Sequence, residues 1–166
     1  MDKRYLLIII IIIICCINLA FIVNSSSVVG SASVSAGNYL FSAPQGFSLY
    51  EDTSWNSAVI KNSDGVRIYF EVNSTNDNYN KKLNYLENKS DDKILSQGNL
   101  NIDNITVNTI FYQTKNNTNY SAFYFELDNI PFKIVISNFD YSDRETIIDY
   151  VTSIIQSTHL DYKTTM

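Results

Sequence analysis

The part of the chain that follows its hydrophobic N-terminal segment contains no cysteine and only one histidine. Both cysteines of the 166-residue sequence, Cys15 and Cys16, lie inside that segment, and the histidine is His159. The remainder therefore has no disulfide, no nucleophilic cysteine and no ligand set for zinc. We expect it to be stable from its hydrophobic core alone.

Charged residues are also scarce, since they make up 17% of the sequence against about a quarter in an average soluble domain. Those present are mostly acidic. The residues after Ala36 include 10 Lys and Arg and 16 Asp and Glu, a net charge of −6. An acidic surface repels phosphate backbones and anionic headgroups, so we expect no nucleic-acid partner and no docking on anionic lipid.

An apolar run, residues 5–23, follows Lys3 and Arg4 near the start of the chain. At about 1.5 Å per residue in a helix, a run of this length nearly spans the ~30 Å hydrocarbon core of a bilayer. The two basic residues favour a cytoplasmic N-terminus, with the rest of the chain outside. The segment 1–23 is therefore predicted to be a transmembrane anchor or a signal peptide, and its partner is the membrane.

The residues that follow leave both of these outcomes open. Residues 24–38 are rich in Ser, Gly and Ala and are predicted to form a linker. Ala32 and Ala36 end small-residue triplets typical of cleavage sites, although the apolar run is longer than that of most cleaved signals. We expect either a single-pass membrane protein with its C-terminal domain outside the cell, or a secreted protein cleaved near Ala32 or Ala36.

Alternating hydrophobicity predicts a series of strands after Tyr39. The clearest pattern is 66–72, where Val, Ile, Phe and Val alternate with Arg, Tyr and Glu. Asp128-Asn129 is a hairpin signal between the last two strands. The predicted strands are 47–50, 55–60, 66–72, 94–101, 105–112, 120–127 and 132–137.

Two amphipathic helices are predicted from apolar residues at helical spacing. In the first, 77–90, one face carries Tyr79, Leu83 and Leu86. The second, 142–157, begins at a Ser142-x-x-Glu145 capping box. Its apolar stripe consists of Ile147, Ile148, Val151, Ile154 and Ile155.

The element order βββαββββα, with short turns between strands, predicts an α+β fold in which helices pack on an antiparallel sheet. The predicted domain covers 39–158, and 159–166 is predicted to be a frayed tail.

Several stretches of the domain resemble the PsbP-like family, which has an α-β-α sandwich fold. They include the Pro-x-Gly-Phe opening at 44–47, Ile-Leu-Ser-Gln-Gly at 94–98 and Ile-Thr-Val at 105–107. The strand 132–137 (Phe-Lys-Ile-Val-Ile-Ser) and the helix end 153–157 look like the closing unit of small exported PsbP-like surface proteins of methanogenic archaea. The resemblance implies an α-β-α sandwich and a non-enzymatic accessory or binding domain outside the membrane.

Candidate chemical sites are weak. His159 and Asp161 lie in the predicted tail, which does not provide the rigid orientation of a catalytic relay. The alternating oxygen side chains of Asn99-x-Asn101-x-Asp103 suit calcium, but Asn104 and Ile110 stand where an EF-hand loop needs Gly and Glu. Asp140 and Asp143 flank the start of the last helix, where a capping role is expected. We therefore assign no catalytic, metal-binding or cofactor-binding residue and expect no cofactor.

Two surface features remain. Five Asn-x-Ser/Thr triplets fit the N-glycosylation acceptor, and they begin at Asn73, Asn88, Asn104, Asn116 and Asn119. Tyr69, Tyr112 and Tyr124 fall on the more polar faces of their strands, where exposed rings would stack on a sugar or a peptide. Because an α-β-α sandwich buries both faces of its sheet, we expect a helix to cover them instead.

Two functions follow from these observations. The first is an extracytoplasmic, non-catalytic binding or accessory domain of the cell envelope, with an unidentified envelope protein or glycan as its partner. The alternative is an envelope hydrolase that uses Asp/Glu chemistry, which requires two converging carboxylates. The acidic residues are scattered singly or in turn pairs such as Asp91-Asp92, which favours the binding domain.

Overall fold

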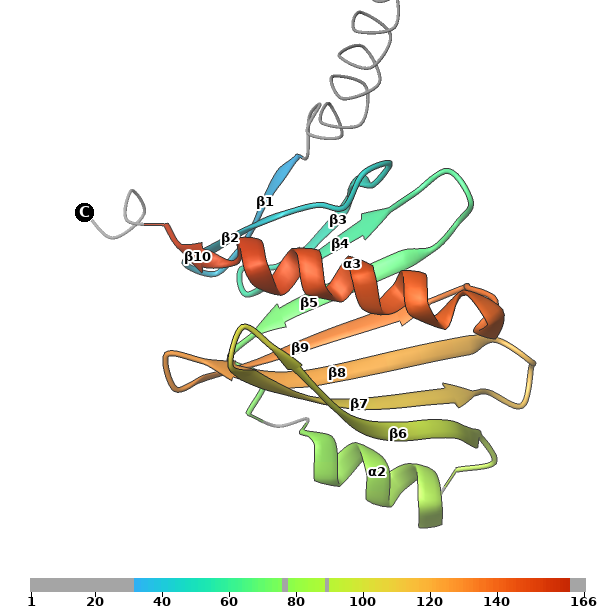
Figure 1. Cartoon of the computed structure of the whole chain (residues 1–166). Helices are drawn as coiled ribbons and strands as arrows, with labels where there is room; N and C mark the ends of the chain where they lie inside the picture. The colour runs from blue at the N-terminus through green and yellow to red at the C-terminus, as the bar shows by residue number, and fades with distance from the viewer. Residues whose placement is uncertain (1–31, 76–77, 89, 162–166) are drawn as a thin grey trace, which may run out of the picture. The chain divides into compact units, whose positions relative to one another are not determined.

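The computed structural model describes residues 32–75, 78–88 and 90–161, which form an α+β domain (Figure 1). The predicted membrane or signal segment, 1–23, and residues 24–31 of the predicted linker lie outside these residues. Within them, no helix has the length and hydrophobicity to cross a membrane. In chain order the elements are β1 Ser33–Ala36, β2 Tyr39–Ser42, β3 Ser48–Ser54, β4 Ser57–Lys61, β5 Arg67–Val72, α2 Tyr79–Asn88, β6 Lys93–Ile102, β7 Ile105–Gln113, β8 Asn119–Leu127, β9 Ile130–Ser137, a 3₁₀ turn Tyr141–Asp143, α3 Arg144–Ser157 and β10 His159–Leu160.

The main sheet contains seven antiparallel strands in the order β3-β4-β5-β9-β8-β7-β6. These are the seven strands predicted from the sequence, and with α2 and α3 they follow the predicted order. Two of the hairpins, β6–β7 and β8–β9, turn through Asp-Asn pairs, 103–104 and 128–129, in which both residues have positive φ. Turns with this backbone match the twist of the paired strands, and Asn and Asp tolerate the left-handed conformation.

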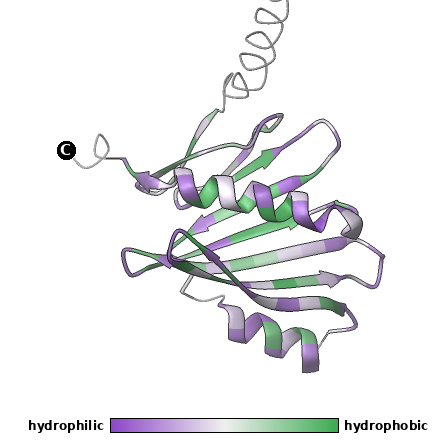
Figure 2. Ribbon diagram, viewed as in Figure 1, coloured by the Kyte–Doolittle hydropathy of each residue, from purple (hydrophilic) through white to green (hydrophobic). Residues whose placement is uncertain are grey.

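The core lies between one face of this sheet, called here the inner face, and α3, which crosses it (Figure 1). Figure 2 shows that hydrophobic and hydrophilic residues alternate along α3. The predicted stripe is confirmed: Ile147, Val151, Ile154 and Ile155 are buried, and Ile148 is half-buried against the same cluster. From the sheet, the fully buried side chains at the core include Ile60, Ile68, Phe70, Phe123, Phe132, Ile134 and Ile136.

A second, three-stranded sheet in the order β1-β2-β10 corrects both predicted ends of the domain. Residues 33–36, predicted to be linker, form β1, which pairs with β2 and places Val34 and Ala36 in the core. His159 and Leu160, predicted to be tail, pair with Leu40 and Tyr39. The folded region therefore extends from about Ala32 to Asp161. Its end strands were missed because each is short and is held by pairing with a distant segment, which leaves little local periodicity.

The start of α3 also differs from the prediction. Residues 141–143 form a 3₁₀ turn, and Asp140 caps it by accepting a hydrogen bond from the Ser142 backbone N–H at 3.0 Å. The N-cap residue of α3 itself, Asp143, makes no side-chain capping bond. The predicted Ser142–Glu145 capping box is therefore wrong, because the 3₁₀ turn moves the cap two residues towards the N-terminus. The predicted capping role of Asp140 is confirmed, and its bonds with Ser142 lower the pKa of the Asp140 carboxyl.

Candidate functional site: a tyrosine cleft on the uncovered half of the sheet

The other face of the main sheet, called here the outer face, is only half covered by a helix. α2 lies at the β6–β7 end of the sheet (Figure 1) and contacts both strands. Its Leu86 packs with Ile110 and Tyr112 of β7 and with Ala122 and Tyr124 of β8 in a second small core. Within the described residues, no helix covers β3, β4, β5 or β9 on this face.

The strand register determines which side chains lie together on the uncovered half. Three rows cross β4, β5 and β9 in order. Because side chains of an antiparallel sheet alternate between its faces, the three residues of each row project to the same side. The rows are Lys61–Arg67–Ser137, Val59–Tyr69–Val135 and Ser57–Glu71–Lys133.

Residues of the first two rows, together with neighbours on β3 and β8, line a shallow cleft of about 280 Å³, called here the tyrosine cleft. Three tyrosines line it, namely Tyr50 of β3, Tyr69 of β5 and Tyr120 of β8. The other lining residues are Glu51, Val59, Arg67, Val135 and Ser137. Small-molecule sites commonly combine apolar and aromatic walls with a few polar groups, and this cleft has that composition.

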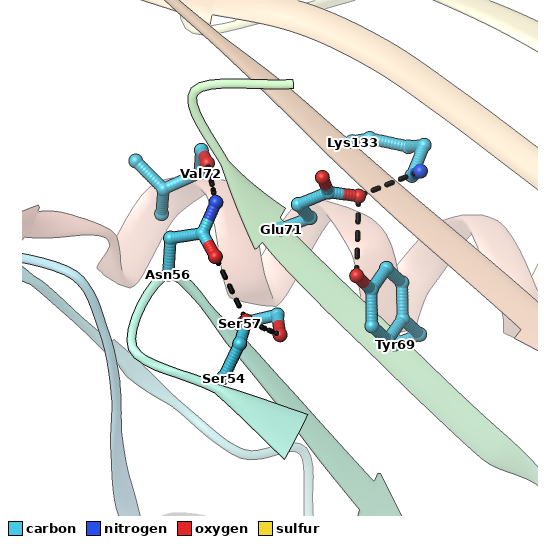
Figure 3. Close-up of polar contacts among 7 residues, drawn as sticks. All are labelled: Ser54, Asn56, Ser57, Tyr69, Glu71, Val72 and Lys133. Carbon is cyan, nitrogen blue, oxygen red and sulfur yellow. Dashed lines mark hydrogen bonds and ion pairs between the residues drawn. The ribbon is translucent and has the colours of Figure 1, made fainter. Parts of the chain in front are cut away.

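Beside the cleft, an ion pair is largely withdrawn from solvent. Lys133 Nζ lies 2.6 Å from Glu71 Oε2, with the two side chains 10% and 22% exposed. The Tyr69 hydroxyl donates to the same carboxylate oxygen at 3.2 Å (Figure 3). Lys133 Nζ also lies 5.4 Å from the centre of the Tyr69 ring. These contacts fix the orientation of Tyr69, because its ring and its hydroxyl are both engaged.

Burial is the main cause that raises the pKa of Tyr69 above the ordinary tyrosine value of 10.0. A hydrogen bond with the Ser57 side chain opposes this effect, and the adjacent Glu71 charge adds to it. Tyr69 is therefore a neutral hydrogen-bonding ring at physiological pH.

The β3–β4 hairpin is attached to β5 through a short chain of polar contacts (Figure 3). Asn56 Nδ2 donates to the Val72 carbonyl at 3.0 Å, and Ser54 Oγ donates to Asn56 Oδ1 at 2.8 Å. Ser54 and Ser57 hydroxyls are 2.7 Å apart. These bonds hold Ser57 beside Tyr69 and position the strand that carries Tyr50.

At the edge of the cleft, two cations lie over the exposed ring of Tyr50. Lys61 Nζ is 5.2 Å and Arg67 Cζ is 5.3 Å from the ring centre. Tyr50 is 52% exposed, so its ring is accessible to a ligand. At the opposite side of the cleft, Tyr120 stacks on Tyr112 with a centroid distance of 5.4 Å.

The structure separates the three tyrosines that the sequence grouped. Tyr112 and Tyr124 are covered by α2, each only 6% exposed, which confirms the expected burial for these two. Tyr69 instead lies in the uncovered cleft, so the expectation that a helix covers it is wrong. Sequence reasoning missed Tyr50 and Tyr120 as site residues, because the position of α2 on the sheet is not encoded in strand periodicity.

The other weighed residues form no site in the described part of the chain. His159 is exposed, and its Nδ1 lies 2.7 Å from the Ser157 carbonyl oxygen. Asn99 and Asn101 are exposed along β6, and Asp103 accepts a hydrogen bond from Gln156 at 3.1 Å. No group of three or more His, Cys, Asp or Glu suited to a metal ion occurs among the described residues.

The acceptor triplets differ in accessibility. Asn119 donates to the Phe139 carbonyl and accepts from Gln113, and the Ser121 hydroxyl of its triplet is buried. By contrast, Asn104 and Asn116 are exposed at hairpin turns.

A larger hollow of about 700 Å³ lies near the start of α2. Its polar lining consists mainly of neutral side chains such as Asn80, Thr106 and Asn108, and Glu126 is the charged residue in it. It therefore offers no cation to anchor a ligand. The tyrosine cleft has the exposed ring of Tyr50, Arg67 in its lining and Lys61 at its edge, and we take it as the candidate site.

No family model and no curated protein matches the chain. Several solved structures are similar to it. Cyanobacterial PsbP from Synechocystis sp. PCC 6803 is 10% identical, with a TM-score of 0.47 over 80% of this chain and 95% of that one. LpqN, described as involved in cell envelope biogenesis of Mycobacterium tuberculosis, is 13% identical, with a TM-score of 0.48 over 78% and 89%. PA94 of Pseudomonas aeruginosa, a protein of unknown function, is 9% identical, with a TM-score of 0.48 over 74% and 94%. A PsbP protein is thus among the structures that this chain resembles, and at these identities the likeness concerns the path of the chain and not a ligand.

Proposed function

We propose that the chain is an exported, non-catalytic binding domain of the cell envelope that holds its ligand in the tyrosine cleft. The observation that carries the proposal is the uncovered half of the outer face. Elsewhere the sheet is buried by α3 and α2, whereas here Tyr50, Tyr69 and Tyr120 surround a concave surface open to solvent. Accessible aromatic surface of this kind is typical of an interaction site.

The acidic residues at the cleft favour binding over hydrolysis. A glycosidase needs two carboxylates roughly 5–10 Å apart on either side of the bond that is cleaved. Among the described side chains, the carboxylates at the cleft are Glu51, which lines it, and Glu71, in the ion pair beside it. Because Glu71 is engaged by Lys133 and Tyr69, it is held as a structural partner of the tyrosine, which leaves Glu51 without a second acid among the described residues of the cleft.

Export is the second part of the proposal and rests on the apolar run 5–23 after Lys3 and Arg4. The fold also bears on processing. Removal of the chain up to Ala36 would delete β1, whose Val34 and Ala36 are 4% and 0% exposed in the core. Cleavage after Ala32 would leave β1 intact, so a secreted form should begin at Ser33.

Two measurements test this function. Protease added to intact cells should degrade the C-terminal domain, and protection that is lost only on lysis would show that the domain is inside. The chain from Ala32 onward, which lacks the predicted membrane segment and forms a compact unit, should also co-sediment with isolated cell envelopes, and Tyr50→Ala should reduce this binding.

Tyr85→Ala is the matched control for that variant. Tyr85 lies on α2, is 49% exposed and has Lys82 Nζ 5.6 Å from its ring centre, so it has similar exposure and a similar cation contact away from the cleft. Equal loss in the two variants would refute a role for the cleft. Release of reducing sugars from envelopes by the purified chain would favour the hydrolase instead.

A further inference from the structure

Two like charges lie directly opposite each other at the edge of the tyrosine cleft. Lys61 and Arg67 are register partners on β4 and β5, and both lie over the ring of Tyr50. Like charges at directly opposed positions of an antiparallel pair are destabilising. Among the described residues, neither cation forms an ion pair. Lys61 and Arg67 thus depart from the usual avoidance of like charges at opposed strand positions. In a chain with a net charge of −5, such a pair of cations indicates a site for an anion.

The surrounding charges support this reading. Lys133 is neutralised by Glu71 at 2.6 Å. Glu51 also lines the cleft, so one carboxylate opposes the two cations there. Among the described side chains, Arg67 and Glu51 in the lining and Lys61 at the edge leave an excess of one positive charge beside the tyrosine rings.

Over β4, β5 and β9, a ligand is recognised through side chains rather than through the backbone. β4, β5 and β9 each pair with a strand on both sides, so their N–H and C=O groups are used within the sheet. A peptide that adds as an extra strand needs a free sheet edge, and on this side of the sheet that edge is the outer side of β3, beyond the rows of the cleft. The cleft instead offers tyrosine rings, Arg67 and the Ser137 hydroxyl in its lining, with Lys61 at its edge. These groups suit a ligand made of rings that carry hydroxyls and a negative charge.

We propose that the tyrosine cleft binds an acidic saccharide, with a sugar ring against the tyrosines and its carboxylate paired with Arg67 and Lys61. This inference rests on the proposed binding function and adds the class of ligand. The guanidinium of Arg67 presents parallel N–H donors that match a carboxylate. A cleft of about 280 Å³ is at the small end of ligand sites, and it holds one or two sugar units.

The test is calorimetric titration of the full chain in detergent with oligogalacturonate and oligoglucuronate. The methyl-esterified oligosaccharides are the controls, because they keep the rings and remove the charge. At least one acidic oligosaccharide should bind, its methyl ester should bind about 10-fold or more weakly, and the difference should shrink as salt is added. An ester that binds as well as the acid, or no binding of either acid, would overturn the inference.

Variants locate the contact. Arg67→Gln should weaken binding of the acidic oligosaccharide about 10-fold or more and leave binding of the ester unchanged. Arg144→Gln is the matched control, because it removes the same charge from α3, on the opposite face of the sheet. Equal effects of the two variants would mean that only the overall charge of the chain matters, and the site would be refuted.

A polyglutamate peptide distinguishes saccharide from acidic protein. If it binds as tightly as the oligosaccharides, the ligand is an acidic peptide and the inference fails. The failure of the inference is separable from that of the function. Envelope binding that remains sensitive to Tyr50→Ala while no acidic saccharide binds would preserve the function and reject the ligand class. Envelope binding that is insensitive to Tyr50→Ala would reject the function itself.

Discussion

Replacement of Lys133 by methionine tests whether the ion pair beside the cleft holds the uncovered half of the sheet together. Methionine keeps most of the length and the apolar contacts of the lysine and removes its charge. Glu71 would then keep the Tyr69 hydroxyl as a partner at 3.2 Å but would lose the ammonium group at 2.6 Å. The carboxylate would remain in a place where its side chain is only 22% exposed.

The size of the effect follows from this burial. Breaking a fully buried pair costs about 3–5 kcal/mol, whereas an exposed pair contributes about 0–1 kcal/mol. The side chains are 10% and 22% exposed, so the pair lies nearer the buried limit, and residual contact of Glu71 with water reduces the cost. We expect a loss of about 2–3 kcal/mol in the free energy of unfolding. In a domain of this size, that loss lowers the melting temperature by roughly 6–15 °C.

The measurement is urea and thermal unfolding followed by circular dichroism. Lys93→Met is the control, since Lys93 is exposed at the start of the edge strand β6, and it should change stability by less than about 0.5 kcal/mol. The double variant Lys133→Met/Glu71→Leu removes both charges and should recover most of the loss. If Lys133→Met unfolds like Lys93→Met, or if the double variant is no more stable than Lys133→Met, the pair is not buried in solution and the account of the cleft is wrong.

Four further outcomes are expected. Ile154→Ala, on the buried side of α3 where the side chain has 0% exposure, should cost about 2–5 kcal/mol in the free energy of unfolding. Ser153→Ala, on the exposed side of the same helix, should cost under about 1 kcal/mol, and similar melting of the two variants would show that α3 does not cover the sheet. Ser121→Ala should leave the free energy of unfolding in urea unchanged or raise it by up to about 1 kcal/mol, because the buried Ser121 hydroxyl has no hydrogen-bond partner in the described structure. A clear loss of stability would mean that the hydroxyl does form a hydrogen bond in solution. Burial raises the pKa of Tyr39 and Tyr69 above 10.0, so the stability that these neutral phenols contribute is present below pH 10 and is lost as the pH rises through their folded-state pKa. Tyr69→Phe should therefore reduce the fall of the melting temperature at alkaline pH, and an unchanged fall would exclude Tyr69 as a cause. Reductant and chelator should leave cooperative melting unchanged, because the chain after residue 23 has no cysteine and one histidine; loss of folding in chelator would reveal a calcium site.

The sequence alone determined the elements whose signal is local. The seven strands of the main sheet follow from residues that alternate every second position, as in 66–72, and α3 follows from its stripe of Ile and Val. The Asp-Asn turns at 103–104 and 128–129 were also readable, because few residues other than Gly, Asn and Asp tolerate the left-handed backbone that such turns need. In each case, the residues that carry the signal are neighbours in the chain.

The small sheet and the cleft were decided by contacts between distant residues. Residues 33–36 are a strand because they pair with residues 39–42, which in turn pair with His159 and Leu160 more than a hundred positions away. Tyr69, Tyr112 and Tyr124 have the same local pattern, and only the position of α2 buries the last two and leaves the first open. Strand periodicity shows which side chains share a face, whereas the packing of a helix on that face depends on the shape and apolar surface of the whole sheet. For this reason the fold could be predicted largely from the sequence, and the cleft that we propose as the binding site could not.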